Sequence, residues 1–570
     1  MEKWTIKNIK APVEELSRRL NINPIIAKLL FNRNVKSLKQ AIDFLYPNLD
    51  NLNDPFKILD MKKAVNIISE AILHNEHIAI FGDYDVDGVI STYILYCAIS
   101  KLGGNVSYII PHRVYDGYGI NTNMVQKAFN NGVQLIITCD NGIAAFEAIK
   151  YAKELGIKVI ITDHHEIPLS DEKEEILPDA MAILNPKRCD DEYPFKKLCG
   201  AGVVLKLIEA LFIHFNKTGW RKYIEFAAIA TVCDVVDLEG ENRIIVCHGL
   251  KMLNNTNNLG LRALIKEAGL FGKTINANHL GYIIGPCINA SGRLEKADHS
   301  LKLLLAQNDG EASEFAELLC DLNGERQRIT SDGIDIAVNM MNYYDKRFKI
   351  IVLNINEIHQ SVAGIVAGRI KDRYHLPCII LTKVSEGLKG SGRSIEAYNM
   401  FEELSKVKHL MNKFGGHALA AGLTIDEDKL DEFIKTLNDK CTLTDDDVAP
   451  IISIDAKLSF NELTFGLYDD IKMLEPYGTG NHRPVFAERG VSICKIELLG
   501  KNKNVIKLVL KSNGIIYDGL MYHQDIEKFD QFKKKSSIGS KIDIVFTLDV
   551  NQFLDKKNLQ LIISSYRPSY

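Results

Sequence analysis

Short apolar runs that alternate with helix-length segments are the feature that most restricts the fold of this chain. Four such runs lie between residues 77 and 165, and each is short enough to be a strand. Segments of helical length and polarity separate them. This alternation predicts a parallel β-sheet covered by helices, which is the α/β class of fold. The four runs are HIAIFGD (77–83), NVSYIIP (105–111), VQLIITCD (133–140) and IKVIITDHH (157–165).

Side chains that can bind metal ions follow the ends of three of these runs, and a further cluster lies in ATVCDVVDL. Because ligands bind at the carboxyl ends of the strands in open α/β sheets, we expect these side chains to converge. Carboxylates with an occasional imidazole suit Mg²⁺ or Mn²⁺. One aspartate at a strand end is more simply a helix cap, but four clusters favour a metal site. The candidates are Asp83, Asp85, Asp87, Asp140, Asp163, His164, His165 and Asp234.

The first cluster, GDYDVDG, begins like a calcium-binding loop. An EF-hand needs a bidentate glutamate at about the twelfth position of the loop, counted here from Asp83. Ile94 occupies that position. The sequence therefore excludes an EF-hand, and the missing ligands must come from other strand ends.

Length and composition exclude several classes of protein. The 570 residues are enough for several domains, and 46% hydrophobic and 25% charged residues are ordinary for a globular protein. No uninterrupted apolar run approaches the roughly 20 residues of a membrane span, and the first residues lack an apolar signal core. Eleven cysteines without a C-x-x-C pair indicate free thiols in a reducing compartment. We therefore expect a cytoplasmic protein.

The formal net charge of −4 excludes a globally basic nucleic-acid binder. Any binding of a polyanion must come from local patches. One region leans positive: from Glu488 to Tyr570 there are fourteen lysines and arginines against nine acidic residues, densest in KNKNVIK and KKKSS. A solvated lysine-rich surface and a binding role explain this excess equally well.

The pattern of the sequence changes twice more. Residues 294–342 contain few helix breakers and predict a long helical connector, and a second strand–helix rhythm follows it. That rhythm leads into KGSGRS and FGGHALAAG, whose glycines permit close approach of the backbone to a ligand. After about Pro450, five alternating runs predict a small β-barrel. We expect a helical segment over 1–70, an α/β domain over 71–293, a helical connector over 294–345, a second α/β domain over 346–450 and the barrel over 451–570.

Four motifs of the chain, GDYDVDG, CDNGI, TDHHE and TVCDVVD, resemble those of the DHH phosphoesterases in order and spacing. Further motifs are similar to those of the RecJ-type single-stranded-DNA-specific exonucleases. The resemblance runs from roughly residue 70 onward and implies a DHH domain, a second domain of the DHHA1 type and an OB-like barrel. These motifs are YIIPHRVYDGYGIN, NPKRCDDEYPFKKLCGAGV, GPCINASGRL, HQSVAGIVAGR, KGSGRS, GGHALAAG and LEPYGTGNHRPVF.

The resemblance also implies two divalent cations, Mn²⁺ or Mg²⁺, which would activate water for in-line attack at phosphorus. Asp85 and Asp140 would bind one cation, with Asp83 as an additional ligand. Asp140 would bridge the two ions. The second cation would be bound by Asp87, Asp140, His164 and Asp234.

The roles of Asp163 and His165, the two residues next to His164, stay undecided between three alternatives. Asp163 and His165 would bind metal directly, orient His164, or contact the substrate. The catalytic set implied by the resemblance is Asp85, Asp87, Asp140, His164, His165 and Asp234.

Phosphate binding is implied for a further set of residues. An arginine taken alone is more often a surface ion-pair partner, and a histidine in a turn is more often hydrogen-bonded there, so the motif match carries this assignment. Cys287 stands where a basic residue is common in the family, and Gln360 and Ser361 replace a Pro-Gly pair, so DNA contacts at these positions would differ. The expected substrate-binding residues are Arg113, Arg293, His359, Ser391, Arg393 and His417.

The activity implied by the resemblance is processive 5′-to-3′ degradation of single-stranded DNA to mononucleotides in recombination and repair. Single-stranded-DNA-binding protein and a helicase would be partners, and we expect a monomer without membrane association. Tyr477 and Phe486 would stack on bases or, more commonly for such residues, pack in a core.

Two rival functions stay open. A DHH-type nanoRNase or small-nucleotide phosphatase would share the metal site but generally lacks the barrel. A catalytically silent scaffold would bind only DNA or a replication complex, and its expected mark is loss of the metal carboxylates, which are present here.

Overall fold

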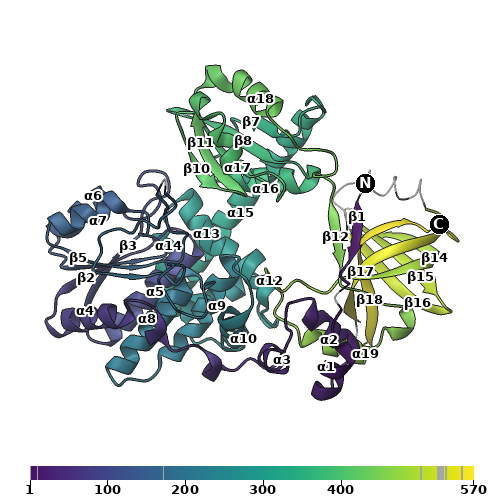
Figure 1. The fold of residues 1–570 in the computed structure, drawn as a ribbon, viewed down its shortest axis with the longest axis horizontal. Coiled ribbons are helices and arrows are strands. Elements are labelled where there is room, and N and C mark those ends of the chain that lie inside the picture. The colour runs from purple at the N-terminus through teal and green to yellow at the C-terminus, as the bar shows by residue number, and fades with distance from the viewer. Residues whose placement is uncertain are drawn as a thin grey trace.

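Two α/β domains and a β-barrel make up the molecule, and a long helix joins the two α/β domains (Figure 1). The computed structural model describes residues 2–8, 10–170, 172–500, 504–522, 532, 536–553 and 556–569. Among these residues, no helix combines the length and the apolar character needed to cross a bilayer. The fold class expected from the sequence is confirmed.

Five parallel strands form the sheet of the first domain, in the order β3-β2-β4-β5-β6. Because β2 lies between β3 and β4, the chain leaves β2 toward one edge of the sheet and leaves β4 toward the other. The carboxyl ends of β2 and β4 therefore adjoin at the topological switch point, where open α/β sheets bind ligands. The strands are β2 (His77–Phe81), β3 (Asn105–Ile109), β4 (Leu135–Cys139), β5 (Lys158–Thr162) and β6 (Ala182–Leu184).

Helices cover both faces of this sheet. Helices α4, α5, α8 and α9 bury one face in the largest core, where Ile80 and Ile137 are fully buried, and α6 and α7 bury the other face with Phe81 and Ile136. Burial on both faces explains why the strands are apolar at successive positions instead of alternate ones. The helices are α4 (Met61–Leu73), α5 (Val86–Lys101), α6 (Thr122–Asn130), α7 (Phe146–Glu154), α8 (Gly200–His214) and α9 (Ile224–Cys233).

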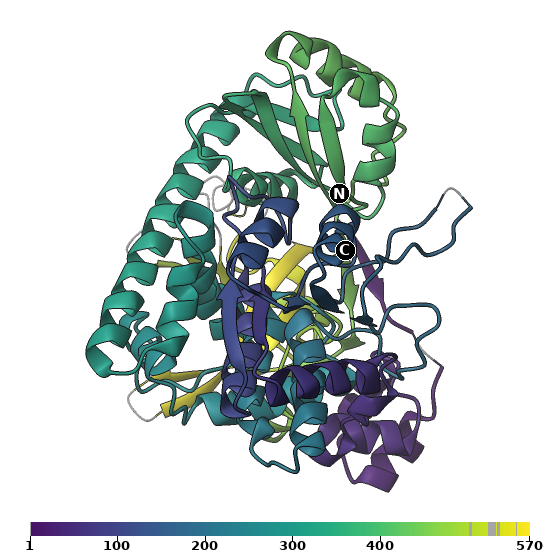
Figure 2. The same ribbon diagram turned by 90° about the vertical axis from the view of Figure 1, so that its left-hand side faces the viewer.

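A run of helices leads from the first domain to the second. Its last member, α15 (Asp309–Met341), has 33 residues and is about 50 Å long. In Figure 2 it rises along one side of the molecule to the second domain. The helices before it are α10 (Gly240–Leu253), α11 (Leu259–Glu267), α12 (Ala277–His279), a π-helical stretch (Leu280–Ile284), α13 (Gly285–Leu294) and α14 (Asp298–Leu305).

The second domain contains a mixed sheet in the order β10-β11-β9-β8-β7, in which only β7 and β8 are parallel. The glycine-rich pieces KGSGRS and FGGHALAAG lie in strands β9 to β11. A Cβ atom on Gly390 would lie 2.6 Å from Leu381, so glycine allows the sheet to pack closely there. The elements are β7 (Ile351–Asn354), α16 (Ala363–Tyr374), β8 (Cys378–Val384), β9 (Gly387–Arg393), α17 (Met400–Ser405), β10 (Lys413–His417), β11 (Ala420–Ile425) and α18 (Leu430–Asp439).

A closed five-stranded barrel follows. Its strands pair in the order β14-β15-β16-β18-β17, and β17 pairs with β14 to complete the closure. All five runs expected to form the barrel are strands. They are β14 (Phe486–Leu499), β15 (Val505–Ser512), β16 (Ile515–Tyr522), β17 (Lys541–Phe553) and β18 (Lys556–Pro568), preceded by β13 (Ala456–Lys457) and α19 (Phe465–Lys472).

The N-terminal segment packs on this barrel. Helices α1 (Val13–Leu20), α2 (Pro24–Phe31) and α3 (Leu38–Leu45) share one apolar core with the barrel strands. The segment is not wholly helical: β1 (Lys3–Ile6) is a strand that pairs in parallel with β12 (Ile451–Ile454). A strand of four residues whose partner lies so far along the chain has no local sequence signal.

Arg243 ties three parts of the chain together. It lies in α10 of the first domain and is 2% exposed. Its guanidinium donates hydrogen bonds to the carbonyl oxygens of Phe44 (2.8 Å), Leu474 (3.0 Å), Met473 (3.3 Å) and Glu475 (2.8 Å), and it stacks on the Phe44 ring at 3.9 Å. One buried side chain thus joins the first domain to the N-terminal helices and to the segment that leads into the barrel.

Replacing Arg243 with alanine should loosen this junction, because four carbonyl oxygens, one of them buried and three partly buried, lose their donors. We expect a cost of about 3 kcal/mol, seen as a lower midpoint of thermal unfolding and faster proteolysis before residue 50. Arg262→Ala is the matched control, since that side chain is 53% exposed and makes one long ion pair with Asp309. Equal stability of the two variants would contradict the role of Arg243.

Candidate metal centre and phosphate site

The end of the loop after β2 and the first turn of α5 bring Asp85 and Asp87 to the switch point. Asp85 caps α5, and its carboxylate accepts a hydrogen bond from the Gly88 N–H at 3.0 Å. Asp87 is buried and accepts N–H groups of Gly200 and Ala201, both at 2.7 Å. These are the first two N–H groups of α8, and a helix N-terminus favours a negative charge. The start of α8 therefore fixes the orientation of the Asp87 carboxylate.

Asp83 lies directly after β2 and is 1% exposed. The backbone N–H groups of Tyr84 and Gly119 favour the charged form of its carboxylate and so lower its pKa, against the larger effect of burial. Gly88 packs on its backbone so closely that a Cβ atom there would lie 2.6 Å from the nitrogen and oxygen of Asp83. The glycine of DVDG therefore permits this compact loop.

Asp140 follows β4 and has left-handed backbone geometry, with φ of 61°. This conformation costs energy for a residue other than glycine. The Tyr118 hydroxyl donates to the Asp140 carbonyl at 2.7 Å, and a Cβ atom on Gly200 would lie 2.8 Å from the Asp140 Oδ1. The surroundings thus hold the carboxylate in a defined place and need glycine at position 200.

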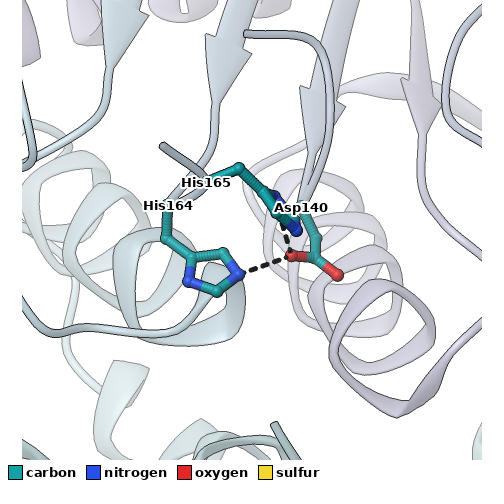
Figure 3. A group of neighbouring side chains, drawn as sticks. All are labelled: Asp140, His164 and His165. Carbon is teal, nitrogen blue, oxygen red and sulfur yellow. Dashed lines mark ion pairs between the residues drawn. The ribbon is translucent and has the colours of Figure 1, made fainter. Parts of the chain in front are cut away.

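Four donor atoms converge at one point. His164 follows β5, and Asp234 follows α9. The Nε2 atom of His164 lies 3.1 Å from the Oδ1 of Asp140, a contact drawn in Figure 3. The same Nε2 atom lies 3.7 Å from the Oδ2 of Asp87 and 3.6 Å from the Oδ2 of Asp234. The contact with Asp140 lacks hydrogen-bond geometry. The structure therefore brings together residues that the sequence places on separate elements.

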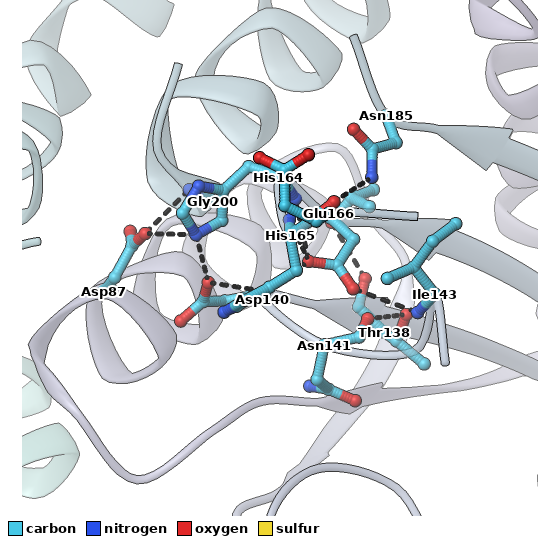
Figure 4. Close-up of polar contacts among 12 residues, drawn as sticks. Asp87, Thr138, Asp140, Asn141, Ile143, His164, His165, Glu166, Asn185 and Gly200 are labelled. Atoms are coloured by element: carbon cyan, nitrogen blue, oxygen red, sulfur yellow. Dashed lines mark hydrogen bonds and ion pairs between the residues drawn. The ribbon is translucent and has the colours of Figure 1, made fainter. Parts of the chain in front are cut away.

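Asp163 holds the two histidines in place. Its Oδ1 accepts the backbone N–H groups of His164 (2.7 Å) and His165 (3.1 Å) and lies 2.7 Å from the His165 Nδ1. Figure 4 shows the two histidines beside Asp140, with Asp87 next to His164. Its Oδ2 accepts the Ile143 N–H at 2.9 Å. Both oxygens are engaged within the protein, so the geometry gives Asp163 a positioning role.

Burial raises the pKa values of four of the clustered carboxyl groups. Burial first, and then the charge of Asp85, raises the pKa of Asp83 to about 8 and that of Asp87 to about 7. Burial and the charges of Asp87 and Asp85 raise the pKa of Asp234 to about 8, and that of Asp140 is also raised well above its usual value. The cluster therefore holds more negative charge than its own surroundings can stabilise.

The two histidines have opposite shifts. Burial, reinforced by the neighbouring His165, lowers the pKa of His164 to about 3, so its imidazole is neutral and can act as a metal ligand. Burial also disfavours the charged form of His165, but the hydrogen bond and the charge of Asp163 outweigh it and raise the pKa of His165 to about 9.

This donor set fits divalent cations. Among the described residues, four buried atoms of the cluster find no hydrogen-bond partner. Leaving such groups buried and unpaired is costly, and a bound cation would remove the cost. Carboxylate oxygens with one neutral imidazole suit Mn²⁺ or Mg²⁺. The four atoms are Asp83 Oδ1, Asp140 Oδ1, His164 Nε2 and Asp234 Oδ2.

Four arginines from different elements form a second cluster, the arginine cluster, beside these carboxyl groups. They are Arg113, Arg293, Arg326 and Arg393. Arg293 of α13 is the central one: burial, then the positive charges of Arg113, Arg326 and Arg393 among others, lower its pKa to about 10. Its Nη1 donates to the Ser361 carbonyl of the second domain at 2.8 Å. Arginines held this close to one another favour an anionic ligand such as phosphate.

The second domain supplies Ser391 and Arg393 from β9. The Arg393 Nη1 donates to the Ser391 hydroxyl (3.1 Å) and to the Gly392 carbonyl (2.7 Å). A Cβ atom on Gly364, in the first turn of α16, would lie 2.7 Å from the Ser391 Oγ and the Arg393 Nη2. The start of a 12-residue helix therefore faces both side chains, which adds N–H groups suited to an anion.

The two expected substrate histidines lie nearer the surface. The Nδ1 of His359 is 2.6 Å from the Ser361 Oγ, and burial lowers its pKa. Ser361 connects His359 to the arginine cluster, because its carbonyl accepts from Arg293. His417 is exposed on β10, where it is in register with Ala420 and, one strand further, with Arg393.

The arginine cluster adjoins the carboxylates and the imidazole described above, which together form the metal-type cluster. The members of the metal-type cluster are Asp83, Asp85, Asp87, Asp140, His164 and Asp234. The Arg113 guanidinium stacks on the Tyr84 ring at 3.9 Å, and Tyr84 lies between Asp83 and Asp85 in the chain. The charge of Arg113 lowers the pKa of Asp83, and the charge of Asp85 raises that of Arg293. The two clusters therefore form one continuous site.

Sequence reasoning missed some residues of this site and left others undecided. Arg326 lies within α15, where a charged residue is normally read as a solvated helix face, and Tyr118 gave no sign that its hydroxyl supports Asp140. Phe486 is fully buried in the barrel core, and the Tyr477 hydroxyl donates to the Ile471 carbonyl, so the core interpretation holds for both. The lysines of KNKNVIK at 501–503 and of KKKSS at 533–535 lie outside the described residues.

Comparison with known proteins agrees with this architecture. Family models match successive parts of the chain: the DHH family N-terminal domain over residues 77–231, the DHHA1 domain over 347–442 and the RecJ OB domain over 454–565. The single-stranded-DNA-specific exonuclease RecJ of Haemophilus influenzae is 32% identical over 99% of both chains. That of Bacillus subtilis is 36% identical over 97% of this chain and 69% of its own length. This chain belongs to the RecJ family of single-stranded-DNA-specific exonucleases.

Solved RecJ structures share the fold and contain metal. RecJ from Thermus thermophilus in complex with Mn²⁺ matches with a TM-score of 0.84 and 25% identity, covering 100% of this chain and 80% of that chain. A manganese-bound exonuclease RecJ matches with a TM-score of 0.61 and 31% identity, covering 70% of this chain and 98% of that chain. The presence of manganese in these RecJ proteins agrees with the donor set found here.

Metal binding should depend steeply on pH. Because the pKa values of Asp83, Asp87 and Asp234 lie near 7 to 8, protons compete with the metal below that range and leave when it binds. The Mn²⁺ affinity should therefore fall about tenfold or more per pH unit as the pH is lowered from 7 to 6. Calorimetric titration in two buffers of different ionisation enthalpy would count the released protons. Asp234→Asn should release fewer, and an affinity independent of pH would contradict the assignment.

Replacing Asp163 with asparagine should weaken metal binding although Asp163 is not expected to touch the metal. The amide removes one oxygen acceptor, so His164 and His165 lose part of their support, and we expect an affinity about 10- to 100-fold lower. The pKa of His165, followed by NMR, should fall at the same time. Asp179→Asn is the control, because its carboxylate is 70% exposed and pairs only on the surface with Lys153.

Proposed function

We propose that this chain is a metal-dependent exonuclease that degrades single-stranded DNA from the 5′ end to mononucleotides by two-metal in-line attack of water. The observation that carries the proposal is the continuity of the two clusters, a metal-type cluster beside a group of arginines. The first suits hydrolysis of a phosphodiester and the second suits a phosphate. The names of the relatives support single-stranded DNA as the substrate.

A group of arginines next to the metal-type cluster favours an end-directed enzyme. A phosphate held by Arg293, Arg326 and Arg393 would lie close to the phosphodiester bound at the carboxylates. Natural DNA usually carries phosphate at its 5′ end and a hydroxyl at its 3′ end. Arginines that hold a terminal phosphate would therefore favour removal of nucleotides from the 5′ end.

Six residues of the chain would bind the two cations. Asp85 and Asp140, with Asp83 as an additional ligand, would hold one cation, and Asp87, Asp140, His164 and Asp234 would hold the other. Two bound divalent cations supply an activated water and stabilise the charge on the attacking and leaving oxygens. Asp163 fixes the backbone of His164 and the ring of His165, so the imidazoles face the site in fixed orientations.

Charge on His165 would assist the leaving group. Its pKa of about 9 keeps it protonated at neutral pH, and it lies 4.0 Å from Asp140 at the edge of the metal-type cluster. A protonated imidazole at that place can stabilise, or donate a proton to, the developing 3′-oxygen. We therefore propose a direct role in catalysis for His165.

The barrel and the biological setting belong to the same proposal. A barrel of this type suits single-stranded nucleic acid, which it contacts along the backbone. We propose that the enzyme acts as a cytoplasmic monomer in recombination and repair, with single-stranded-DNA-binding protein and a helicase as partners. The barrel also distinguishes the chain from nanoRNases and small-nucleotide phosphatases, so single-stranded DNA should be degraded far faster than dinucleotides.

Asp140→Asn should reduce hydrolysis of single-stranded DNA by about 10³-fold or more, because Asp140 is the expected bridging ligand. The assay uses chelated enzyme resupplied with Mn²⁺ or Mg²⁺, and circular dichroism checks the fold. Undiminished activity of this variant would refute the two-metal proposal.

The direction of degradation can be tested with oligonucleotides labelled at one end. Label at the 5′ end should be released first as a mononucleotide, and duplex DNA should be resistant. Arg393→Gln should raise the KM about tenfold for 5′-phosphorylated DNA and less for 5′-hydroxyl DNA, since it removes a phosphate contact. Arg347→Gln, 88% exposed in the same domain, is the matched control. Removal only from the 3′ end would refute the proposed direction.

A further inference from the structure

Two cysteines meet where α13 packs against α15. The Sγ atoms of Cys287, in α13, and Cys320, in α15, are 4.0 Å apart. Cys287 is 2% exposed, whereas Cys320 is half-buried. A disulfide bond is about 2.05 Å long, so a shift of about 2 Å, shared by two side chains and two helices, would allow the bond to form.

This pair is connected to the arginine cluster by a short chain of hydrogen bonds. The side-chain amide of Asn323 donates to the Cys287 Sγ at 3.4 Å. The Asn323 Oδ1 accepts from the Nε (3.1 Å) and Nη2 (2.9 Å) of Arg326. The orientation of Arg326, whose charge acts on Arg293, therefore depends on Asn323 and on the sulfur that it contacts.

Helix α13 also contacts the loop that carries the metal-type carboxylates. The Asn289 Oδ1 accepts the Val86 N–H at 3.2 Å, at the start of α5. A Cβ atom on Gly292 would lie 2.3 Å from the Tyr84 carbonyl oxygen, so the helix and the loop are closely packed at this point. A displacement of α13 would therefore reach both clusters of the site.

We propose that Cys287 and Cys320 form a reversible disulfide that shifts Arg326 and weakens the binding of single-stranded DNA. The formation of the bond stands on the geometry of the two thiols alone. Its effect on DNA rests on the proposed function of the arginine cluster. In a reducing compartment such a bond would form only under oxidative conditions, as is usual for regulatory cytosolic disulfides.

A low-molecular-weight disulfide can serve as the oxidant. The Cys320 thiolate attacks one of its sulfur atoms, a mixed disulfide forms, and the released thiolate takes up the proton that Cys320 lost. The Cys287 thiolate then attacks the Cys320 Sγ, which releases the second small thiol with the proton of Cys287. The two protein thiols are oxidised by two electrons, and the reagent is reduced to two thiols.

The environment of the pair favours the second of these steps. Pairing with Cys287 and burial raise the pKa of Cys320, so the first exchange is slow. In the mixed disulfide Cys320 has no proton to donate, and the amide of Asn323 and the charge of Arg326 then favour the Cys287 thiolate against the effect of burial.

The test uses the full chain with the exposed cysteines replaced, Cys189→Ser and Cys494→Ser, as the parent protein. The parent is incubated with hydroxyethyl disulfide, digested without reduction and analysed by mass spectrometry for a peptide that links Cys287 to Cys320. Affinity for a fluorescent single-stranded oligonucleotide is measured on the same sample. We expect the linked peptide, and an affinity about fivefold lower that dithiothreitol restores.

Two variants made in the parent separate the proposal from general oxidation. Cys320→Ser, with Cys320→Ala as an alternative should the first fold poorly, should give no linked peptide and keep its affinity. Cys97→Ser, another half-buried cysteine, should respond like the parent.

Absence of the linked peptide, an unchanged affinity in the linked protein, or an equal loss in Cys320→Ser would each overturn the proposal. Failure of the proposed function would look different. The reduced parent would then not bind or degrade single-stranded DNA, while the mass spectrum would still decide whether the disulfide forms.

Discussion

The burial of several carboxyl groups at one edge of a sheet is the constraint on which the catalytic half of this protein depends. Removing these groups from water is costly, and few side chains of the protein offset their charge. The surrounding structure meets the constraint with backbone groups: the first N–H groups of α8 hold Asp87, and the left-handed conformation of Asp140 places its carboxylate opposite His164. Gly88 and Gly200 leave the space that this arrangement needs. Local strain and close packing therefore shape the cluster of carboxyl groups and His164.

Much of the fold could be predicted from the sequence because its signals are local. The parallel strands are continuous apolar runs, and the barrel strands alternate in polarity, so both could be recognised within a few residues. Asp83, Asp140 and His164 could be brought together in advance because the ends of parallel strands share one edge of the sheet. These predictions required no knowledge of distant contacts.

Other features could not be predicted, because their meaning depends on partners far away in the chain. Arg326 looks like an ordinary charge on a long helix until α15 is packed against α13 and the second domain. The residues next to Arg243 in the chain are a mixture of apolar and polar types, so they give no sign that its side chain is buried. Its four carbonyl acceptors come from residues 44 and 473–475. Helix α15 is consequently more than a spacer between the domains, since it contributes Arg326 to the arginine cluster and fixes the orientation of that side chain through Asn323.

The pairing of β1 with β12 affects how the chain can fold during synthesis. Lys3 and Ile451 are partners in that pair, so the first strand waits until nearly four-fifths of the 570 residues have been made. At about 5 to 20 residues per second, the delay is roughly 20 to 90 s. Throughout it, the apolar faces of α1 to α3 lack the barrel residues that they pack against in the finished molecule. These apolar faces are therefore buried only once the barrel has been synthesised.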